Sequence, residues 1–385
     1  MRVACLLFAL VACSKPEAVV IATAPQVTDP ESCLGCHEKR QPGLVAQWNA
    51  SAHAREAVTC EDCHGDDHDA IFSAEGRVGV NRCKECHTKE TMAFKRSAHG
   101  QARKHALANA RLLMQIPSMQ RQGCLGCHNM ARDEKPTDDG GEGDAGRCND
   151  CHGAHAYSSK QARQPETCGI CHRGPDHPHI EAYHASKHGV AWATTHDESQ
   201  APTCVTCHMP DGEHEVSGGI TLGRTGSGAV LEGGEMPIPM HTMTETQIRE
   251  ERQVMLDRCK KCHTERTARR MLEDADAIKL EADRLLQQAA DVVERLHADG
   301  LLDPAPSERV AHPTKGHALV LGGPMLYEQH SEAERIFFDL AKFAHAITFK
   351  GAYHQSPDHT HWLGIARLKA SIEELRAEER RLRKD

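Results

Sequence analysis

The stretches Cys148-Asn-Asp-Cys-His152 and Cys168-Gly-Ile-Cys-His172 show the pattern that decides the fold: two cysteines separated by two residues and followed at once by a histidine. The two thiols can bond to the vinyl groups of a haem, and the adjacent imidazole then reaches the iron. The sequence therefore predicts eight covalently bound haem c groups, each with its motif histidine as one iron ligand. The other six motifs are Cys33-Cys36-His37, Cys60-Cys63-His64, Cys83-Cys86-His87, Cys124-Cys127-His128, Cys204-Cys207-His208 and Cys259-Cys262-His263.

The cysteine and histidine counts bear on the alternatives to haem. Pairs of Cys-x-x-Cys knuckles could bind structural zinc ions, and cysteine pairs could form disulfides. Neither alternative gives a reason for a histidine after every second cysteine in a chain with 18 cysteines and 28 histidines. The motifs use every cysteine outside the N-terminal segment. Haem attachment therefore explains the pattern best.

The apolar content is low for a chain of this length. Its 385 residues are 39% hydrophobic and 4% aromatic, which is little for side chains alone to fill a core. Each haem has a large apolar face, so stacked haems are expected to fill the interior. The net charge of −9 argues against a nucleic-acid partner and fits a basic or neutral redox partner, such as a c-type cytochrome or a quinone-linked protein. It fits ordinary solubility equally well.

Residues 1–30 have the composition of a secretion signal and a linker. Arg2 is followed by an apolar run over residues 3–12, which is too short to span a bilayer. The run ends in Leu10-Val11-Ala12-Cys13, which looks like a bacterial lipobox. Cleavage before Cys13 and acylation of its thiol are expected to tether the protein to a membrane surface. A plain signal peptide cut further on is the alternative, and both place the protein outside the cytoplasm, in the periplasm.

Residues 31–243 carry the first seven motifs and are expected to form the haem-binding region. A smaller pattern recurs in it: an aromatic residue, a serine three positions later and a histidine two positions after that. Because the aromatic residue and the histidine are five apart, they are roughly neighbours on a helix. We expect these histidines to be second iron ligands, and His155, three residues after His152, to be a further one. The copies are Trp48–Ser51–His53, Phe94–Ser97–His99 and Tyr183–Ser186–His188.

Residues 244–385, which carry the eighth motif, are expected to form long helices. From residue 244 to residue 297 the chain reads as one helix interrupted by that motif, with apolar residues at alternating spacings of four and three. Ser331 and Glu334 resemble a capping box that begins a second helix, and a third follows Gly364. The apolar stripes predict packing within the chain and a subunit interface. The expected fold class is mainly α, with a haem-packed, loop-rich N-terminal region and long C-terminal helices.

Three stretches resemble the octahaem hydroxylamine oxidoreductase family. They are Cys148-Asn-Asp-Cys-His-Gly-Ala-His155, Cys168-Gly-Ile-Cys-His-Arg-Gly-Pro-Asp-His-Pro-His-Ile-Glu-Ala-Tyr-His-Ala-Ser-Lys-His-Gly189 and Gly351-Ala-Tyr-His-Gln-Ser-Pro-Asp-His-Thr-His-Trp362. The number and order of the motifs and the trailing helices also fit, so the resemblance covers nearly everything after residue 30. It implies a homotrimer in which the other haems relay electrons to or from one catalytic haem.

The resemblance also implies a catalytic centre. In that family the haem at the fourth motif lacks a protein ligand on its distal side; here this haem would lie on Cys124 and Cys127, with His128 as proximal ligand. An Asp–His pair over the open face would be Asp176 and His177. A carboxylate and an imidazole can accept the protons released when hydroxylamine is oxidised, or deliver protons to a nitrogen oxyanion in reverse. A turn in which His177 ligates a neighbouring haem is the alternative.

A tyrosine near the C-terminus decides the direction of reaction in that family. Oxidising members attach it, from an adjacent subunit, to the catalytic haem, and reducing members lack it. If Tyr353 is the matching residue, hydroxylamine oxidation is favoured. If the family's tyrosine aligns inside the box of residues 357–362, His359 has replaced it and reduction is favoured. Tyr353 packing between helices is a further alternative, and Tyr327 is a more distant candidate.

The resemblance therefore implies redox chemistry on hydroxylamine, with oxidation to nitric oxide or nitrite as the first expectation. Ammonia-forming reduction of nitrite or hydroxylamine is the second, and a tetrathionate-type reductase also carries eight haems. A protein that only transfers electrons, between membrane quinol oxidation and a soluble cytochrome, is the hypothesis from another class.

Overall fold

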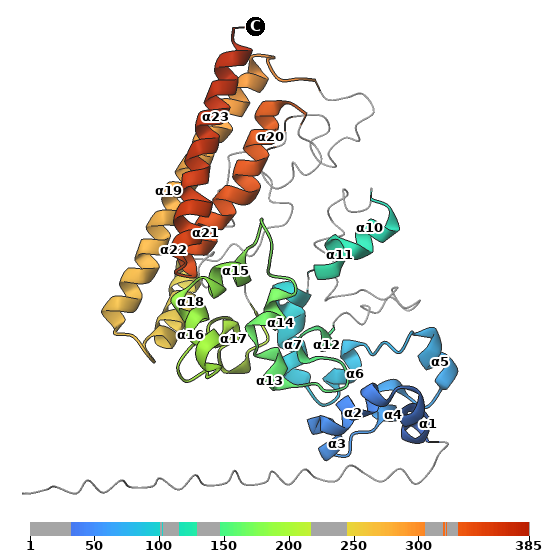
Figure 1. The fold of residues 1–385 in the computed structure, drawn as a ribbon. Coiled ribbons are helices and arrows are strands. Elements are labelled where there is room, and N and C mark those ends of the chain that lie inside the picture. The colour runs from blue at the N-terminus through green and yellow to red at the C-terminus, as the bar shows by residue number, and fades with distance from the viewer. Residues whose placement is uncertain are drawn as a thin grey trace, which may run out of the picture.

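The computed structural model describes residues 32–100, 102, 115–128, 147–216, 245–304, 319, 321 and 330–384. The expected signal segment, its lipidation site at Cys13, the linker and Tyr327 lie outside these residues. Figure 1 shows short helices in the N-terminal region and long helices, side by side, in the C-terminal region.

Short helices joined by turns make up the described part of the N-terminal region. Several begin at the first cysteine of a motif, because the residue before it ends the preceding turn and caps the new helix. Ser32 Oγ accepts the Gly35 N–H at 3.1 Å, and Thr59 and Asp62 bond each other's backbone N–H groups. The helices are α1 (Cys33–Arg40), α2 (Pro42–Ala50), α3 (Ala52–Arg55), α4 (Cys60–His64), α5 (His68–Ser73), α6 (Val80–Lys84), α7 (Thr88–Arg96), α10 (Pro117–Gln122), α11 (Cys124–Cys127), α12 (Asn149–His152), α13 (Ser159–Ala162), α14 (Pro165–Gly169), α15 (His179–His184), α16 (Lys187–Thr195), α17 (Cys204–His208) and the 3-10 helix η1 (Pro210–Gly212).

The C-terminal region is a bundle of longer helices. Two π-helical turns interrupt it, each continuous with the α-helix that follows. The Ser331–Glu334 capping box begins the second long helix: the carboxylate accepts the Ser331 N–H at 2.9 Å, and Ser331 Oγ accepts the Glu334 N–H at 3.2 Å. The elements are α18 (Glu245–Cys259), α19 (Glu265–Ala298), α20 (Glu332–Asp339), the π-turn η4 (Leu340–Ala344), α21 (His345–Tyr353), α22 (Pro357–Thr360), the π-turn η5 (His361–Ile365) and α23 (Ala366–Leu382).

Most of the apolar core lies inside this bundle. The inner faces of α19, α20 and α23 form one cluster, in which Leu296, Phe337, Leu340, Leu368 and Leu375 are fully buried. Each such side chain stabilises the fold by about 1.5–3 kcal/mol through its removal from water. The clusters of described residues in the N-terminal region are much smaller, such as Tyr183, Trp192 and Ala201. The long helices can therefore form a rigid support for a region that has little side-chain core of its own.

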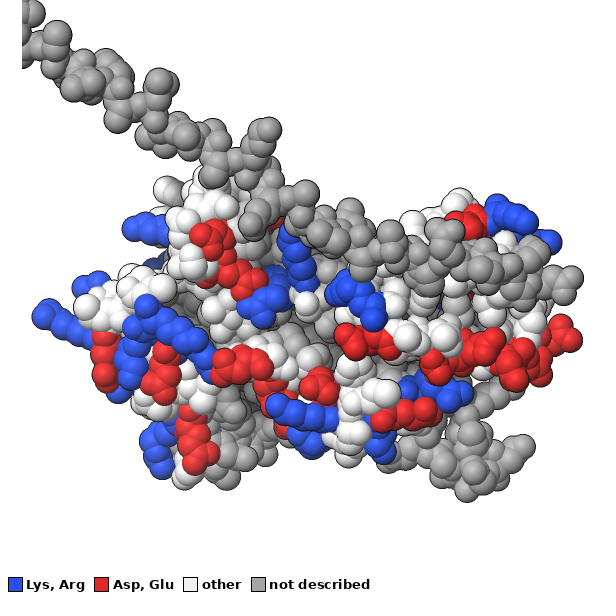
Figure 2. All heavy atoms as spheres, turned by 90° about the horizontal axis from the view of Figure 1, so that it is seen from below, with Lys and Arg blue, Asp and Glu red and all other residues white. Residues whose placement is uncertain are grey.

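The surface carries charges of both signs. Figure 2 shows basic and acidic side chains interspersed over the face seen from below. Among the described helices, none combines the length and the apolar character that crossing a membrane requires.

Candidate functional site

Each motif forms a single helical turn that gathers its three functional side chains. The motif histidine N–H donates to the carbonyl oxygen of the first cysteine, for example from His87 to Cys83 at 2.8 Å and from His172 to Cys168 at 2.9 Å. Residues three and four apart lie on one face of a helix. Two thiols and one imidazole are therefore presented together, as attachment of one haem requires.

Thiols of different motifs lie close enough to interact electrostatically, and these neighbours give the order of the motifs in space. The motifs follow one another as first, second, third, fifth, sixth, seventh and eighth, and the fourth lies beside the sixth. The pairs are Cys33 with Cys60, Cys63 with Cys83, Cys83 with Cys148, Cys151 with Cys168, Cys127 with Cys171, Cys168 with Cys204, and Cys207 with Cys259. Groups attached at these motifs would form a continuous row.

Seven of the motif histidines each face a second histidine. The distances between ring centroids fall in a narrow range although the partners come from different parts of the chain. They are 6.4 Å for His37–His68, 6.3 Å for His64–His155, 6.1 Å for His87–His53, 6.2 Å for His152–His214, 5.8 Å for His172–His99, 6.5 Å for His208–His354 and 6.0 Å for His263–His188.

These separations fit an iron held between two imidazoles. A metal–imidazole bond is about 2.0 Å long, so two ligating nitrogens lie about 4 Å apart and their ring centroids about 6 Å apart. The rings are also in the form that binds a metal, because ligating imidazoles are neutral. Burial lowers the pKa of His208 to about 4, with His354 adding to the effect, and lowers the pKa of His172 to about 4, with His99 adding.

The recurring aromatic–serine–histidine pattern has a local explanation. In each copy the serine is buried and is the N-cap of the turn that carries the histidine. Ser51 Oγ accepts the Ala54 N–H, Ser97 Oγ that of Gly100, and Ser186 Oγ that of Gly189, at 3.1–3.2 Å. Sequence reasoning singled out His53, His99, His155 and His188, and the structure places each beside a motif histidine.

Sequence reasoning missed three facing histidines, His68, His214 and His354. None of them follows the aromatic–serine pattern. His68 opens α5, four residues after His64, and His214 lies just beyond η1 after the seventh motif. His354 follows α21 inside the tail that resembles the octahaem family. Only the Gly-Ala-Tyr-His stretch around His354 carried a signal that could have found one of them.

Asp176 and His177 form a hydrogen-bonded pair that is contacted by Lys342 of η4 and Lys350 of α21. Asp176 Oδ1 lies 2.5 Å from His177 Nδ1, and Lys342 Nζ lies 2.8 Å from the other carboxylate oxygen. Lys350 Nζ donates to the Asp176 carbonyl oxygen at 3.1 Å. Burial alone would raise the pKa of Asp176, but the bonds from His177 and Lys342 outweigh it and hold that pKa well below its ordinary value. Asp176 is therefore ionised.

Both ring nitrogens of His177 face oxygens that can only accept hydrogen bonds. Nδ1 faces the ionised Asp176 carboxylate, and Nε2 lies 3.0 Å from the Cys171 carbonyl oxygen. The Cys171 thiol lies beside the Cys127 thiol of the fourth motif, and burial together with this neighbour raises the pKa of Cys171 to about 12. The His177 ring thus lies near both the fourth and the sixth motif.

Two family models match most of the motif-bearing chain. One, described as seven times multi-haem cytochrome CxxCH, matches residues 141–310. The other, described as cytochrome c554 and c-prime, matches residues 12–65 and 82–160. The chain is a multihaem c-type cytochrome. Its motifs therefore bind haem c covalently, and the seven histidine pairs are the geometry that such groups fit.

Known proteins are similar to this cytochrome along most of its length. A curated relative, a probable nitrite reductase-hydroxylamine oxidoreductase fusion protein of Kuenenia stuttgartiensis, is 26% identical over 460 aligned positions. The alignment covers 92% of the cytochrome and 52% of the relative, so the cytochrome spans about half the length of that protein.

Solved structures confirm the expected fold class. A reducing HAO-like protein complex of Kuenenia stuttgartiensis matches with a TM-score of 0.74 at 24% identity, over 91% of the cytochrome and 85% of that chain. A hypothetical multihaem protein matches with a TM-score of 0.68 at 20% identity, over 90% of the cytochrome and 94% of that chain. The cytochrome has the mainly helical, HAO-like multihaem fold.

Tyr353 of the cytochrome belongs to a different network from the Asp176–His177 pair. Its hydroxyl donates to Asp276 Oδ1 at 2.7 Å, and Asp276 is also paired with Arg252 at 2.8 Å. Burial and the Asp276 carboxylate raise the pKa of the phenol. Tyr353 therefore joins α21 to α18 and α19, and its hydroxyl is directed into the helical bundle of its own chain.

The box of residues 357–362 forms α22 and the start of η5. His359 in it is buried, and its Nδ1 lies 3.0 Å from Ser356 Oγ. The backbone of this box passes close to α21: a Cβ on Gly351 would lie 2.6 Å from the Thr360 backbone nitrogen. Only glycine fits at this contact, so the box fixes the end of the helix that carries Lys350 and His354.

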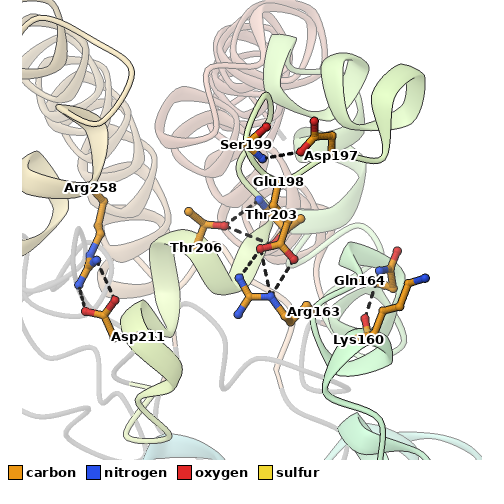
Figure 3. Close-up of polar contacts among 10 residues, drawn as sticks. All are labelled: Lys160, Arg163, Gln164, Asp197, Glu198, Ser199, Thr203, Thr206, Asp211 and Arg258. Carbon is orange, nitrogen blue, oxygen red and sulfur yellow. Dashed lines mark hydrogen bonds and ion pairs between the residues drawn. The ribbon is translucent and has the colours of Figure 1, made fainter. Parts of the chain in front are cut away.

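Polar contacts hold the seventh motif between its neighbours. Figure 3 shows Arg258, at the end of α18, paired with Asp211 of η1, and Arg163 paired with Glu198. Thr203, just before α17, donates its N–H to Thr206 Oγ1 at 3.1 Å. Such half-exposed ion pairs contribute about 0–1 kcal/mol each. Their role is to fix the loops on both sides of α17.

Proposed function

We propose that this cytochrome carries eight haems and reduces a small nitrogen oxyanion, nitrite, and its reduction product hydroxylamine to ammonia at the haem of the fourth motif. The observation that carries the proposal is the Asp176–His177 pair near the fourth motif, in which both ring nitrogens of His177 face oxygens that accept hydrogen bonds. Forming ammonium from nitrite takes up six electrons and eight protons, and releases two water molecules. The site therefore needs a group that can donate protons, and the imidazole of His177, held by Asp176, is such a group.

The haems, when bound, supply stored electrons and one iron position at which the substrate can be coordinated. Seven of them would be held between the histidine pairs described above, and the eighth on Cys124, Cys127 and His128. The row of motifs leads through the sixth to the fourth, so electrons received anywhere along it can reach the substrate.

The charges around Asp176 favour an anionic substrate. Lys342 and Lys350 contribute two positive charges close to Asp176. Positive groups raise the local concentration of an anion and stabilise it when bound. Asp176 stays ionised and keeps the His177 ring oriented through its Nδ1–H. The names of the relatives support this direction, since one includes nitrite reductase and the other is a reducing complex.

Oxidation of hydroxylamine, the first expectation from the sequence, is the second candidate. The curated relative's name includes hydroxylamine oxidoreductase, and the same Asp–His pair could accept protons. We place it second because the Tyr353 hydroxyl is bonded to Asp276 within its own chain. The expectation of oxidation depended on that tyrosine being attached to a haem of an adjacent subunit.

The test is turnover of the purified, fully haem-loaded protein with nitrite and a reduced viologen dye, with ammonium measured as product. Asp176→Asn is expected to lower turnover about a hundredfold, because His177 loses the carboxylate that orients its ring for proton transfer. Asp299→Asn, the same change at the far end of the bundle, is expected to leave turnover unaltered. If every haem is low-spin and indifferent to cyanide and nitrite, the protein is an electron carrier and the proposal fails.

Two further parts of the proposal concern the protein's surroundings. We propose that it is exported, acylated on Cys13 and bound to the outer face of a bacterial inner membrane or another periplasmic surface, where a c-type cytochrome or quinone-linked protein exchanges electrons with it. We also propose a homotrimer. Mass spectrometry of the N-terminal peptide and light scattering of the detergent-extracted protein test these two parts separately.

A further inference from the structure

Lys350 connects the Asp176–His177 pair to the histidine that faces the seventh motif. Its Nζ donates to the Asp176 carbonyl oxygen at 3.1 Å, and its own carbonyl oxygen accepts from His354 Nδ1 at 2.7 Å. The Phe349 ring lies under the ammonium group, with Nζ 4.9 Å from the ring centroid. One residue of α21 thus positions both a proposed iron ligand and the main chain of the catalytic pair.

The contacts of Lys350 lead to the histidines of two motifs. Asp176, whose carbonyl oxygen Lys350 binds, precedes His177, and His177 Nε2 lies 3.0 Å from the carbonyl oxygen of Cys171 in the sixth motif. His354, which bonds the Lys350 carbonyl oxygen, faces His208 of the seventh motif. His179 lies between His172 and His354, with its ring centroid 5.2 Å from that of His172 and 5.7 Å from that of His354. The ammonium group therefore lies beside the junction of the sixth and seventh motifs.

We propose that Lys350 is a positioning residue that raises the reduction potentials of the haems on the sixth and seventh motifs and so gathers electrons next to the catalytic pair. The proposal rests on the haem set of the proposed function. A haem iron gains one electron, and thus one unit of negative charge, when an external one-electron donor reduces it from the ferric to the ferrous state. A fixed cation nearby stabilises the reduced state, and more strongly in a poorly solvated site.

Lys342 provides a matched control because it contacts the same residue, Asp176, through the side-chain carboxylate instead of the main chain. Its Nζ binds the Asp176 side chain at 2.8 Å, and about a third of its side chain is exposed. Lys342 lies in η4, whereas Lys350 bonds His354, which faces the seventh motif. Removing one charge or the other therefore separates an effect on the haems from an effect on the Asp–His pair.

The experiment is a redox titration of the holoprotein, without substrate, with dithionite as the electron donor and the haems followed by EPR. Variants with the same haem content as the parent are compared: Lys350→Gln, which keeps a hydrogen-bond donor without the charge, Lys350→Arg, which keeps the charge, and Lys342→Met. We expect Lys350→Gln to shift the potentials of two low-spin haems to lower values, and both other variants to keep the parent's values.

Unchanged potentials in Lys350→Gln would overturn the proposal, as would an equal shift in Lys342→Met. If Lys350→Gln does not load haem fully, Lys350→Met is titrated in its place under the same criteria. Because no substrate is present, the shift stands even if nitrite proves not to be reduced. Conversely, turnover of nitrite with unaltered potentials in Lys350→Gln would leave the proposed function standing and remove the role of Lys350.

Discussion

Asp283→Asn is predicted to destabilise the helical bundle strongly, because it leaves a buried lysine without its counter-charge. Lys279 in α19 is fully buried, and its Nζ donates to both carboxylate oxygens of Asp283, at 2.8 and 2.7 Å. His345 of α21 lies 2.7 Å from the same carboxylate. Burial lowers the pKa of Lys279, and the Asp283 carboxylate opposes that effect. The asparagine keeps the shape of the side chain and removes only the charge.

The expected loss in free energy of unfolding is about 3–5 kcal/mol at pH 7. Removing one member of a buried ion pair costs about that much. The loss has an upper limit, because Lys279 can give up its proton instead of remaining charged and unpaired. Neutralising a lysine of ordinary pKa at pH 7 costs about 5 kcal/mol, at about 1.4 kcal/mol per pH unit. The exposed edge of Asp283, about a fifth of its side chain, favours the lower end of the range.

The pH dependence gives a second signature. A lysine whose pKa is lower in the folded protein than in the unfolded protein binds fewer protons in the folded state. The free energy of unfolding therefore rises with pH until the ordinary pKa of about 10.4 is passed. In Asp283→Asn the lowering of the Lys279 pKa is unopposed. The variant is therefore expected to recover part of its lost stability between pH 7 and pH 9.

The assay is denaturant unfolding of fully haem-loaded proteins, followed by far-UV circular dichroism at pH 7 and pH 9. The double variant Lys279→Met/Asp283→Asn is the control, because it removes both charges and should recover most of the stability. A loss below about 1 kcal/mol in Asp283→Asn, or an equal loss in the double variant, would refute the reasoning.

Three further outcomes follow from the contacts. His354→Ala is expected to leave the iron bound by His208 with an open position, which appears as a new high-spin EPR signal that cyanide removes. Tyr353→Phe should lose about 1–2 kcal/mol of stability, because its bond to Asp276 is removed, and should keep nitrite turnover. In the parent protein, mass spectrometry should find the Tyr353 peptide without the mass of a haem; a haem-bearing peptide would restore oxidation as the first candidate. Gly189→Ala is expected to destabilise by about 2–4 kcal/mol, because its Cβ would lie 2.0 Å from a backbone oxygen, and unfolding that matches the parent's would contradict this.

Much of the fold could be predicted because its signals are local. A Cys-x-x-Cys-His motif is read within five residues, and the helical stripe from Met271 to Leu296 within one helix. The serine caps before His53, His99 and His188 are local as well. Sequence spacing can therefore indicate that a turn presents a histidine, although it does not say which motif that histidine faces.

The missing parts of the site depend on tertiary contacts. His214 faces His152, and His354 faces His208, across separations of 62 and 146 residues that no periodicity links. The same holds for Lys342 and Lys350, which reach Asp176 from another region of the chain. Reasoning from the sequence considered Asp176 and His177 as a pair and could not identify Lys342, which helps to keep Asp176 ionised, or Lys350.

The π-turn η4 explains how one helix brings both lysines to Asp176. In an uninterrupted α-helix, residues eight apart point about 80° away from each other. A π-turn takes up an extra residue, so the turn over residues 340–344 brings Lys342 closer to the face of Lys350. Because α21 then continues regularly, His354 follows Lys350 by one turn on that face. The irregular turn thus allows one helix to bring two positive charges to Asp176 and a histidine to the seventh motif.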